Sequence, residues 1–310
     1  MNTENESCLV TGAFNYTGKY IARRLIQDGK KVKTLTNHPD NSDPNYGLIE
    51  IYPFSFDNFD KLTESFKNIK IFFNTYWIRY SYKNKINHEK AVQNSIMLFQ
   101  AAKKAGVKKV VHISVSNPSI QSTLPYFKGK AIVEQELMKI FPSYSIIRPT
   151  IIYSLEDVLI SNIAWLLRKF PIFPIFGDGK YSVQPVLIDD LVELVISEGM
   201  SDKSKIIDSC GPEKFTYREL VELISTEIKS KSLIFNLNPY LAFILSKPIS
   251  FFMKDNLITF NEIKGLMSNL LISEITPTGK TIFSEWLREN VSMLGLKYKN
   301  DLVKHYHLLG

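Results

Sequence analysis

The feature that most constrains the fold is a glycine-containing turn between an apolar run and a helical pattern near the start of the chain. Residues 8–10 are apolar, residues 19–27 repeat with helical spacing, and between them lies the run Gly12-Ala13-Phe14-Asn15-Tyr16-Thr17-Gly18. A strand, a tight turn and a helix in this order are typical of a pyrophosphate-binding turn. The amides and the positive dipole end of such a helix favour a bound phosphate group.

Position 15 departs from the usual pattern of this turn. Asn15 stands where a middle glycine normally lets the backbone approach the pyrophosphate. Asparagine tolerates a positive φ better than most residues, so we expect the turn to survive while a side chain crowds the phosphate. This predicts weaker or shifted dinucleotide binding, and an ordinary strand-to-helix turn without a ligand is the alternative.

Apolar, β-rich segments alternate with helical patterns through the first half of the chain. Strands are expected at residues 31–36, 47–52, 69–76, 109–114 and 144–148, and helices at residues 59–67, 88–105 and 129–140. Such alternation predicts an α/β fold with a Rossmann-type, doubly wound parallel sheet, whose ligands bind at the carboxyl ends of the strands. We expect a dinucleotide-binding domain at residues 1–150 and a smaller substrate lobe at residues 151–310, interleaved with the sheet.

The second half is less regular. We expect a helix at residues 157–170, a loop at 171–180, a strand entering a helix at 186–198, and a helix that a capping box starts at Thr216 and Glu219. Residues 240–253 and 261–272 are apolar at helical spacing with lysines at their margins, which suits a lid or core, a partner surface or a membrane-surface helix. Asp255 and Glu262 interrupt the cationic face, which argues against membrane adsorption.

A tyrosine and a lysine four positions apart give the strongest indication of chemistry. Tyr126 and Lys130 share one face of a helix, and Ser114 and Ser116 follow the preceding strand. A nearby ammonium group favours the phenolate, so the pKa of the tyrosine falls from about 10 toward the range of a useful general acid or base. The spacing by itself also arises by chance, and the position after the fifth strand is what favours a functional pair.

With these motifs in this order, the chain resembles the short-chain dehydrogenase/reductase superfamily, in its extended or atypical branch, over nearly its full length. The resemblance implies that Ser116, Tyr126 and Lys130 are the catalytic residues. It implies a cofactor site formed by Gly12, Ala13, Phe14, Asn15, Tyr16, Thr17, Gly18, Asn37, His38, Asn74, Thr75, Ser114, Lys130, Pro149 and Thr150. Within that branch the runs at residues 74–79 and 125–130 are similar to the NAD-dependent epimerase/dehydratase type related to the 39 kDa subunit of respiratory complex I.

The end of the second expected strand bears on the choice of cofactor. Thr36-Asn37-His38 lacks both the acidic residue that binds the ribose hydroxyls of NAD and the arginine that clamps the 2′-phosphate of NADP. With Lys33 nearby, we expect the end of this strand to be mildly basic and free of acid, which favours NADP slightly over NAD. Ser55 also stands where relatives often have an aspartate for the adenine.

Composition and charge exclude several other classes of protein. The 310 residues carry a formal net charge of +7, but the lysines are scattered, so nucleic-acid binding is not expected. No apolar run reaches the ~18 residues of a membrane span, and residues 1–7 do not resemble a secretion signal, so we expect no stable membrane insertion and a cytoplasmic location. Cys8 and Cys210 read as reduced core residues, and no metal site is expected.

Two functional hypotheses remain open. The first is an NAD(P)-dependent oxidoreductase or epimerase/dehydratase that acts on a small carbonyl or hydroxyl substrate, with the tyrosine as its acid/base group. The short connection between Ser116 and Tyr126 favours a simple carbonyl or double bond over a nucleotide sugar. The second is a non-catalytic NAD(P)-binding protein that regulates or stabilises an assembly. The resemblance also leaves a homodimer open.

Overall fold

The computed structural model describes residues 7–81 and 87–300, and the chain divides into two compact units. The first unit comprises Met1–Arg148 and Val192–Ile207, and the second comprises Pro149–Leu191 and Asp208–Gly310. The chain therefore leaves the first unit, enters the second and returns for one segment before it ends in the second. The expected domain boundary at residue 150 lies beside the first of these crossings.

A seven-stranded sheet forms the first unit, with the strand order β11-β6-β5-β4-β1-β2-β3. The strands are β1 (Ser7–Thr11), β2 (Lys31–Leu35), β3 (Ile49–Tyr52), β4 (Ile71–Asn74), β5 (Lys109–Ile113), β6 (Tyr144–Pro149) and β11 (Lys205–Ser209). Every pairing from β3 across to β6 is parallel. The order reverses between β1 and β4, as in doubly wound folds. The predicted Rossmann-type α/β fold is confirmed.

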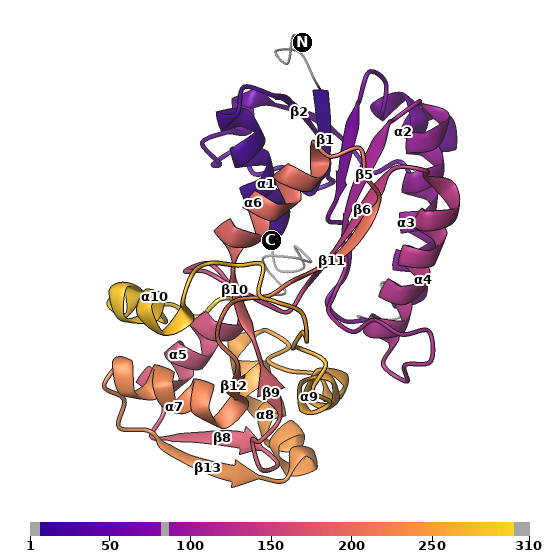
Figure 1. The fold of residues 1–310 in the computed structure, drawn as a ribbon. Coiled ribbons are helices and arrows are strands. Elements are labelled where there is room, and N and C mark those ends of the chain that lie inside the picture. Colours follow the sequence, from indigo (N-terminus) through magenta and orange to yellow (C-terminus); the bar gives the residue numbers. More distant parts are fainter. Residues whose placement is uncertain (1–6, 82–86, 301–310) are drawn as a thin grey trace. The chain divides into compact units, whose positions relative to one another are not determined.

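Helices cover both faces of this sheet. In Figure 1, α2 (Phe59–Ser65), α3 (His88–Lys104) and α4 (Pro125–Ile140) line one face, and α1 (Tyr16–Gln27) lies on the other. Successive side chains of β4 point to opposite faces of the sheet. Phe72 belongs to the core beneath α3 and α4, with Phe99 and Leu137. Phe73 lies against Gly199, at the end of α6 (Ile188–Gly199), where an added Cβ would come within 2.7 Å of the phenyl ring.

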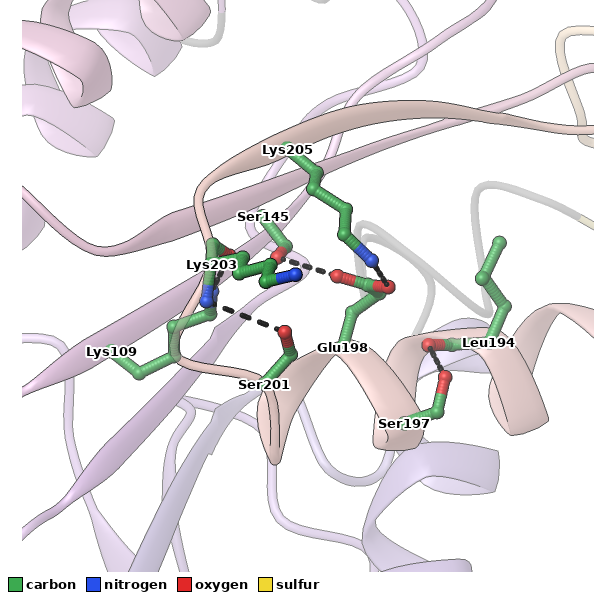
Figure 2. A network of polar contacts seen from close by, with 8 residues as sticks. All are labelled: Lys109, Ser145, Leu194, Ser197, Glu198, Ser201, Lys203 and Lys205. Atoms are coloured by element: carbon green, nitrogen blue, oxygen red, sulfur yellow. Dashed lines mark hydrogen bonds and ion pairs between the residues drawn. The ribbon is translucent and has the colours of Figure 1, made fainter.

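A polar network attaches the returning segment to the sheet of the first unit (Figure 2). Glu198, near the end of α6, is 6% exposed and accepts hydrogen bonds from Ser145 Oγ at 3.1 Å and Lys205 Nζ at 2.9 Å. Lys109 of β5 donates from Nζ to the carbonyl of Lys203 at 2.7 Å, and its burial lowers the pKa of this amine. Buried charges are stable only when they are paired in this way. The network holds α6 and β11 against β5 and β6.

The second unit has several short sheets around one apolar core. Its strand pairs are β7 (Ile151–Tyr153) with β10 (Pro185–Leu187), β8 (Ile172–Phe176) with β13 (Leu233–Leu237), and β9 (Ser182–Val183) with β12 (Phe215–Thr216). Its helices are α5 (Leu159–Lys169), α7 (Tyr217–Glu227), α8 (Pro239–Met253), α9 (Phe260–Met267) and α10 (Phe283–Asn290). The predicted capping box at α7 is confirmed, because Thr216 Oγ1 accepts from Glu219 N and Glu219 Oε2 accepts from Thr216 N.

Two sequence predictions for this unit are wrong. The segment expected to be a loop at residues 171–180 contains β8, which pairs in parallel with β13 at a distance of about sixty residues along the chain. No local pattern reveals so distant a partner, and Pro174 within β8 obscures the strand further. The helix expected at residues 261–272 ends at Met267 instead. Asn269 follows with φ 53° and accepts from Ser182 N at 2.6 Å, so it terminates the helix.

Both thiols, Cys8 and Cys210, are free and fully buried, as the sequence predicts. None of the helices in residues 7–81 and 87–300 has the length and apolar character that crossing a membrane requires. Within the same ranges, no group of three or more His, Cys, Asp or Glu side chains gathers that could hold a metal ion.

A buried aspartate gives the second unit a predictable response to pH. Asp157 is 2% exposed and accepts from the amides of Ile160 (2.6 Å) and Ser154 (3.3 Å) at the start of α5. Burial raises the pKa of this carboxyl group to about 6. The folded chain therefore binds this proton more tightly than the unfolded chain, whose aspartates titrate near 3.9, and stability falls as pH rises from about 4 to about 6.

We expect Asp157→Asn to remove this pH dependence. Between about pH 4 and pH 6 the wild type should lose about 2 kcal/mol of stability relative to the variant, as measured by urea unfolding at each pH. Asparagine retains an acceptor for Ile160 N, so the cap itself should persist. Parallel pH profiles of the two proteins would show that the carboxylate is charged in the folded chain throughout this range.

Candidate dinucleotide and proton-transfer site

The turn after β1 has the tight geometry that its glycine predicts. Gly12 has φ 66°, a left-handed conformation that favours glycine. Its amide donates to Leu35 O at 3.0 Å, and its carbonyl accepts from Asn15 N at 2.8 Å. Ala13 N donates to Thr34 Oγ1, which in turn donates to Val10 O. The turn is thus tied to both β1 and β2 before α1 begins.

Gly18 brings α1 into close contact with the end of β1. A Cβ added at this position would lie 2.2 Å from Gly12 O and 2.9 Å from Thr11 O. Both atoms belong to the backbone and cannot move aside as a flexible side chain could. Only glycine at this position therefore permits such close packing of α1 on β1.

Asn15 does not have the conformation that its sequence context predicts. Its φ is −93° with ψ 165°, an extended backbone that any residue adopts, so no tolerance of positive φ is needed here. Its side chain lies over the turn, because a Cβ built on Gly12 would be 3.1 Å from Asn15 Nδ2. Asn15 precedes α1 without a side-chain capping bond. The first-turn amides of a helix have no acceptor within the helix.

The remaining residues of the turn are half-buried. Phe14 contacts the ring of Tyr46, with 5.8 Å between ring centroids, and Tyr16 contacts Tyr20 at 5.9 Å. Thr17 lies between them in sequence, on the first turn of α1. Aromatic rings therefore flank the start of the helix on both sides of the glycine turn.

The end of β2 is less basic than the sequence predicts. Asn37 and His38 are exposed, but Asn37 Oδ1 accepts from Phe54 N at 2.8 Å. Lys33 lies 3.6 Å from Glu50 Oε2 and donates to Lys67 O, so its ammonium group is already paired. Residues 36–38 contain no acid, as expected, but β3 places the Glu50 carboxylate beside Lys33 in the middle of β2, so this lysine adds little positive charge. A strand neighbour cannot be read from local sequence.

Asn74 and Thr75 hold the strands together at their carboxyl ends. Asn74 is fully buried; its Oδ1 accepts from Thr11 Oγ1 at 3.2 Å, and its Nδ2 lies 3.1 Å from His112 Nδ1. Thr75 donates to Thr11 through its amide at 2.8 Å and its hydroxyl at 2.5 Å. These side chains therefore connect β1, β4 and β5 beside the glycine turn. We infer that these side chains position the strand ends on which the candidate site is built.

Lys130 is a buried lysine of the candidate site with a strongly lowered pKa. It lies on α4, which begins at Pro125, four residues before the expected helix start at residue 129. The helix therefore includes Tyr126. The side chain is 2% exposed, and Nζ donates to Ile113 O, at the end of β5, at 2.6 Å. Burial lowers the pKa of Lys130 to about 7, although Glu134 opposes the shift. This amine therefore exchanges its proton near neutral pH.

Trp77 covers both members of the tyrosine–lysine pair. Lys130 Nζ lies 4.6 Å from its ring centroid, and the ring of Tyr126 meets it edge-on at 5.9 Å. His88 also packs against both aromatic rings, each at 5.9 Å. Gly129 allows the indole this close, since an added Cβ would lie 2.9 Å from Trp77 Cη2. The packing of Trp77 therefore joins it to the candidate site.

The serines after β5 lie at the same edge of the sheet. Ser114 N donates to Ile147 O at 2.7 Å, and its buried Oγ has no hydrogen-bond partner among the described residues. Ser116 is fully buried, and Asn117 after it has φ 52°. Ile113 O accepts the hydrogen bond from the Lys130 amine. Ser114 and Ser116 therefore come directly after the residue that anchors this lysine.

One ion pair of this region escaped the sequence analysis. Arg148 donates to both carboxylate oxygens of Glu134, at 3.0 Å and 2.5 Å, and the Glu134 side chain is 3% exposed. Glu134 follows Lys130 by four residues on α4, so it lies on the same helix face. The four-residue spacing between Lys130 and Glu134 was the only feature of the sequence that pointed to Glu134. Paired arginine–carboxylate contacts of this kind fix both groups in position.

Pro149 and Thr150 lie at the boundary of the two units. Pro149 ends β6, and Thr150 belongs to the second unit. The Thr150 hydroxyl donates to Gln184 O at 2.5 Å, and its amide donates to Ser209 O at 3.0 Å. These bonds serve the packing of the second unit.

The first unit suits a dinucleotide at the pyrophosphate position. The positive φ of Gly12, the close approach at Gly18 and the start of α1 without a side-chain cap leave backbone amides available for an anion. The ribose position lacks the usual carboxylate, because Asn37 stands at the end of β2 and its oxygen is occupied.

Comparison with solved structures identifies similar folds. A nucleoside-diphosphate-sugar epimerase from Staphylococcus aureus matches with a TM-score of 0.72 at 16% identity, over 91% of this chain and 99% of that chain. A UDP-glucose 4-epimerase from Thermus thermophilus, solved in complex with NAD, matches with a TM-score of 0.62 at 16% identity, over 75% of this chain and 87% of that one. At such identities the likeness concerns the fold alone.

Sequence relatives are subunits of the mitochondrial NADH dehydrogenase. The alpha subcomplex subunit 9 of Arabidopsis thaliana is 23% identical over 71% of this chain and 57% of its own length. The 40 kDa subunit of the Neurospora crassa NADH-ubiquinone oxidoreductase is 26% identical over 71% and 59%, respectively. The chain thus spans less than two thirds of these relatives.

Both the relatives and the solved structures confirm the resemblance predicted from the sequence. The model of the NAD dependent epimerase/dehydratase family matches residues 8–197, which is more than half of the chain. The match includes the glycine turn, the serines after β5 and the tyrosine–lysine pair. The chain belongs to the NAD dependent epimerase/dehydratase family.

Proposed function

We propose that this protein is an NAD(P)-dependent enzyme that oxidises, reduces or epimerises a small carbonyl or hydroxyl substrate. The observation that carries the proposal is the contact between Gly18 and the backbone of Gly12 at the start of α1. It leaves first-turn amides for a pyrophosphate, in a chain whose family is NAD-dependent. Retention of Ser116, Tyr126 and Lys130 at one sheet edge supports a proton-transfer role beside that turn.

Each of the three residues has a proposed role. Tyr126 gives or accepts the proton of the substrate oxygen, and Ser116 orients that oxygen by a hydrogen bond. Lys130 holds the cofactor ribose and exchanges its proton near neutral pH, since burial lowers its pKa to about 7. To reach a ribose it must exchange its bond to Ile113 O. The bound nicotinamide supplies or accepts the hydride.

The choice between NAD and NADP rests on the end of β2. No carboxylate follows β2 where NAD-binding sites usually have one, which favours NADP. The pairing of Lys33 with Glu50 removes one of the cations on which that preference was based. We keep a slight preference for NADP as a proposal, and titration with both cofactors decides it.

A second function is favoured by a specific arrangement. Lys130 is bonded to the main chain and covered by Trp77, so it is held away from solvent. This fits a dinucleotide-binding protein without turnover, and the relatives are respiratory complex subunits. In this alternative the bound dinucleotide stabilises the first unit within an assembly of the NADH dehydrogenase type.

Tyr126→Phe distinguishes the two candidates. Purified protein is titrated with NADH and NADPH by nicotinamide fluorescence, and carbonyl substrates are then screened with the cofactor that binds. For an enzyme, the variant should bind the cofactor as the wild type does and lose turnover by about 10²–10⁴-fold. The variant Phe127→Leu, whose ring packs on Tyr126 with 5.5 Å between centroids, tests whether any aromatic change reduces turnover.

The remaining outcomes are decisive as well. Cofactor binding without turnover in the wild type would favour the assembly subunit. Equal turnover in wild type and Tyr126→Phe would remove the tyrosine from the mechanism. Absence of binding for both cofactors would reject both candidates.

A further inference from the structure

An exposed apolar face on α8 has no role in the proposed function. Among the α8 side chains that the structure describes, the exposed ones are apolar except for one lysine. Their exposed fractions are large for apolar groups: Tyr240 63%, Leu241 52%, Ile244 60%, Leu245 59%, Phe251 81% and Phe252 81%. We call these six residues the α8 stripe. Contiguous apolar patches of this kind mark interaction sites on soluble proteins.

Helical geometry makes the stripe continuous. Its members occur at intervals of one, four and seven positions, so with 3.6 residues per turn they all lie on one side of the helix. The opposite side of α8 packs inward through Ala242 and Ser246, which are 4% and 6% exposed. Phe243 and Tyr240 contact Phe260 at the start of α9, which fixes the helix in the second unit. The stripe is therefore held outward by the fold.

Lysines border the stripe and carry no carboxylate partner among the described residues. Lys247 Nζ lies 4.1 Å from the ring centroid of Phe243, and Lys264 Nζ lies 4.7 Å from that of Phe260. Lys254 is exposed directly after the helix. Lysine stems placed along apolar surface in this way let the ammonium group reach outward to anionic groups.

The two acidic residues of this region accept hydrogen bonds from within the second unit. Residues 238–267 contain two carboxylates, Asp255 and Glu262. Asp255 is 5% exposed and accepts from Tyr298 Oη at 2.7 Å. Glu262 Oε2 accepts from both the amide and the hydroxyl of Thr259, at 2.8 Å each, within the capping box of α9. Both carboxylates accept hydrogen bonds from within the unit, which weakens the sequence argument against membrane adsorption.

We propose that the α8 stripe is a docking surface for an anionic phospholipid bilayer, on which α8 lies in the plane of the interface. Phenylalanine and leucine side chains enter the boundary between headgroups and acyl chains, and the bordering lysines bind lipid phosphate and carboxylate groups. The positive charge of Lys247, Lys254 and Lys264 complements such a membrane. The proposal is independent of the dinucleotide site.

A second copy of the chain is a poorer occupant of the stripe. A helix of 15 residues is roughly 22 Å long and about 10 Å wide, so one face covers a few hundred Å². A stable protein interface requires about 800 Å² from each partner. The lysine borders would also face each other across a two-fold axis, where like charges repel.

Vesicle sedimentation of the full chain tests the proposal. Vesicles of phosphatidylcholine alone are compared with vesicles in which one lipid in three is phosphatidylserine. We expect binding to the anionic vesicles, weakened at least tenfold by the double variant Phe251→Ser/Phe252→Ser. Lys247→Ala/Lys264→Ala should weaken it several-fold and reduce its dependence on salt. Leu48→Ser, which removes a side chain 62% exposed in the first unit, should leave binding unchanged.

Three results would overturn the proposal. The first is no sedimentation of the wild type with anionic vesicles at low salt. The second is equal binding by wild type and the double phenylalanine variant, with circular dichroism showing that both are folded. The third is a wild-type dimer in solution that the double variant converts to a monomer, which would assign the stripe to a second copy.

Discussion

Replacing Gly18 by alanine should lower the stability of the first unit by about 3 kcal/mol or more and abolish dinucleotide binding. The added Cβ would lie 2.2 Å from Gly12 O and 2.9 Å from Thr11 O, so α1 must move away from β1. Alanine favours a helix over glycine by about 1 kcal/mol, which the steric clash outweighs. Displacement of α1 also carries its amides away from the proposed pyrophosphate position.

Gly47→Ala is the matched control for this experiment. Gly47 is exposed in the same unit, an added Cβ there meets nothing within 4 Å, and its φ is not positive. Its effect on stability should stay within about 0.5 kcal/mol. Thermal unfolding followed by circular dichroism and fluorescence titration with NADH measure the two effects. Similar behaviour of the two variants would show that the approach of α1 to β1 is not tight.

Lys130→Met should remove a rise in stability with pH that the wild type shows between about pH 6 and pH 9. Burial lowers the pKa of Lys130 to about 7 in the folded chain, whereas an unfolded lysine titrates near 10.4. Between these values the unfolded chain holds more protons, so raising the pH favours folding. Relative to the variant, the wild type should gain roughly 3 kcal/mol over this range.

Lys128→Met provides the comparison for this pH series. Lys128 lies on the same helix but is exposed, so its variant should show the wild-type pH profile. Urea unfolding at several pH values yields the slopes. A Lys130→Met profile parallel to that of the wild type would mean that the buried amine keeps its proton up to high pH. If the enzyme proposal holds, the same variant should also lose turnover.

The local patterns of the first unit predicted its architecture well. Short apolar strands alternating with helices gave the sheet, because each β–α repeat is encoded within a few residues. The steric role of Gly18 was predictable for the same reason, since it depends only on the geometry of one turn. The second unit was less predictable, because β8 is stabilised by β13, far away in sequence.

For the candidate site, the sequence identified the chemical groups and the tertiary structure decided their state. Tyr126 and Lys130 were found from their spacing, whereas the pKa of Lys130 is lowered by burial, against the opposing charge of Glu134. Glu50 beside Lys33 likewise results from the pairing of strands. The contact of Trp77 with Gly129 depends on how the segment after β4 packs on α4.

The sequence by itself determined the glycine turn, the α/β alternation and the candidate proton-transfer residues. Each of these depends on residues close together in the chain, where steric and periodic rules act directly. Only the tertiary structure decided that Asn15 is extended, that Asp255 is buried and that Lys130 is desolvated. Burial, pairing and protonation depend on which distant segments pack around a group, because solvation is a property of the folded surroundings.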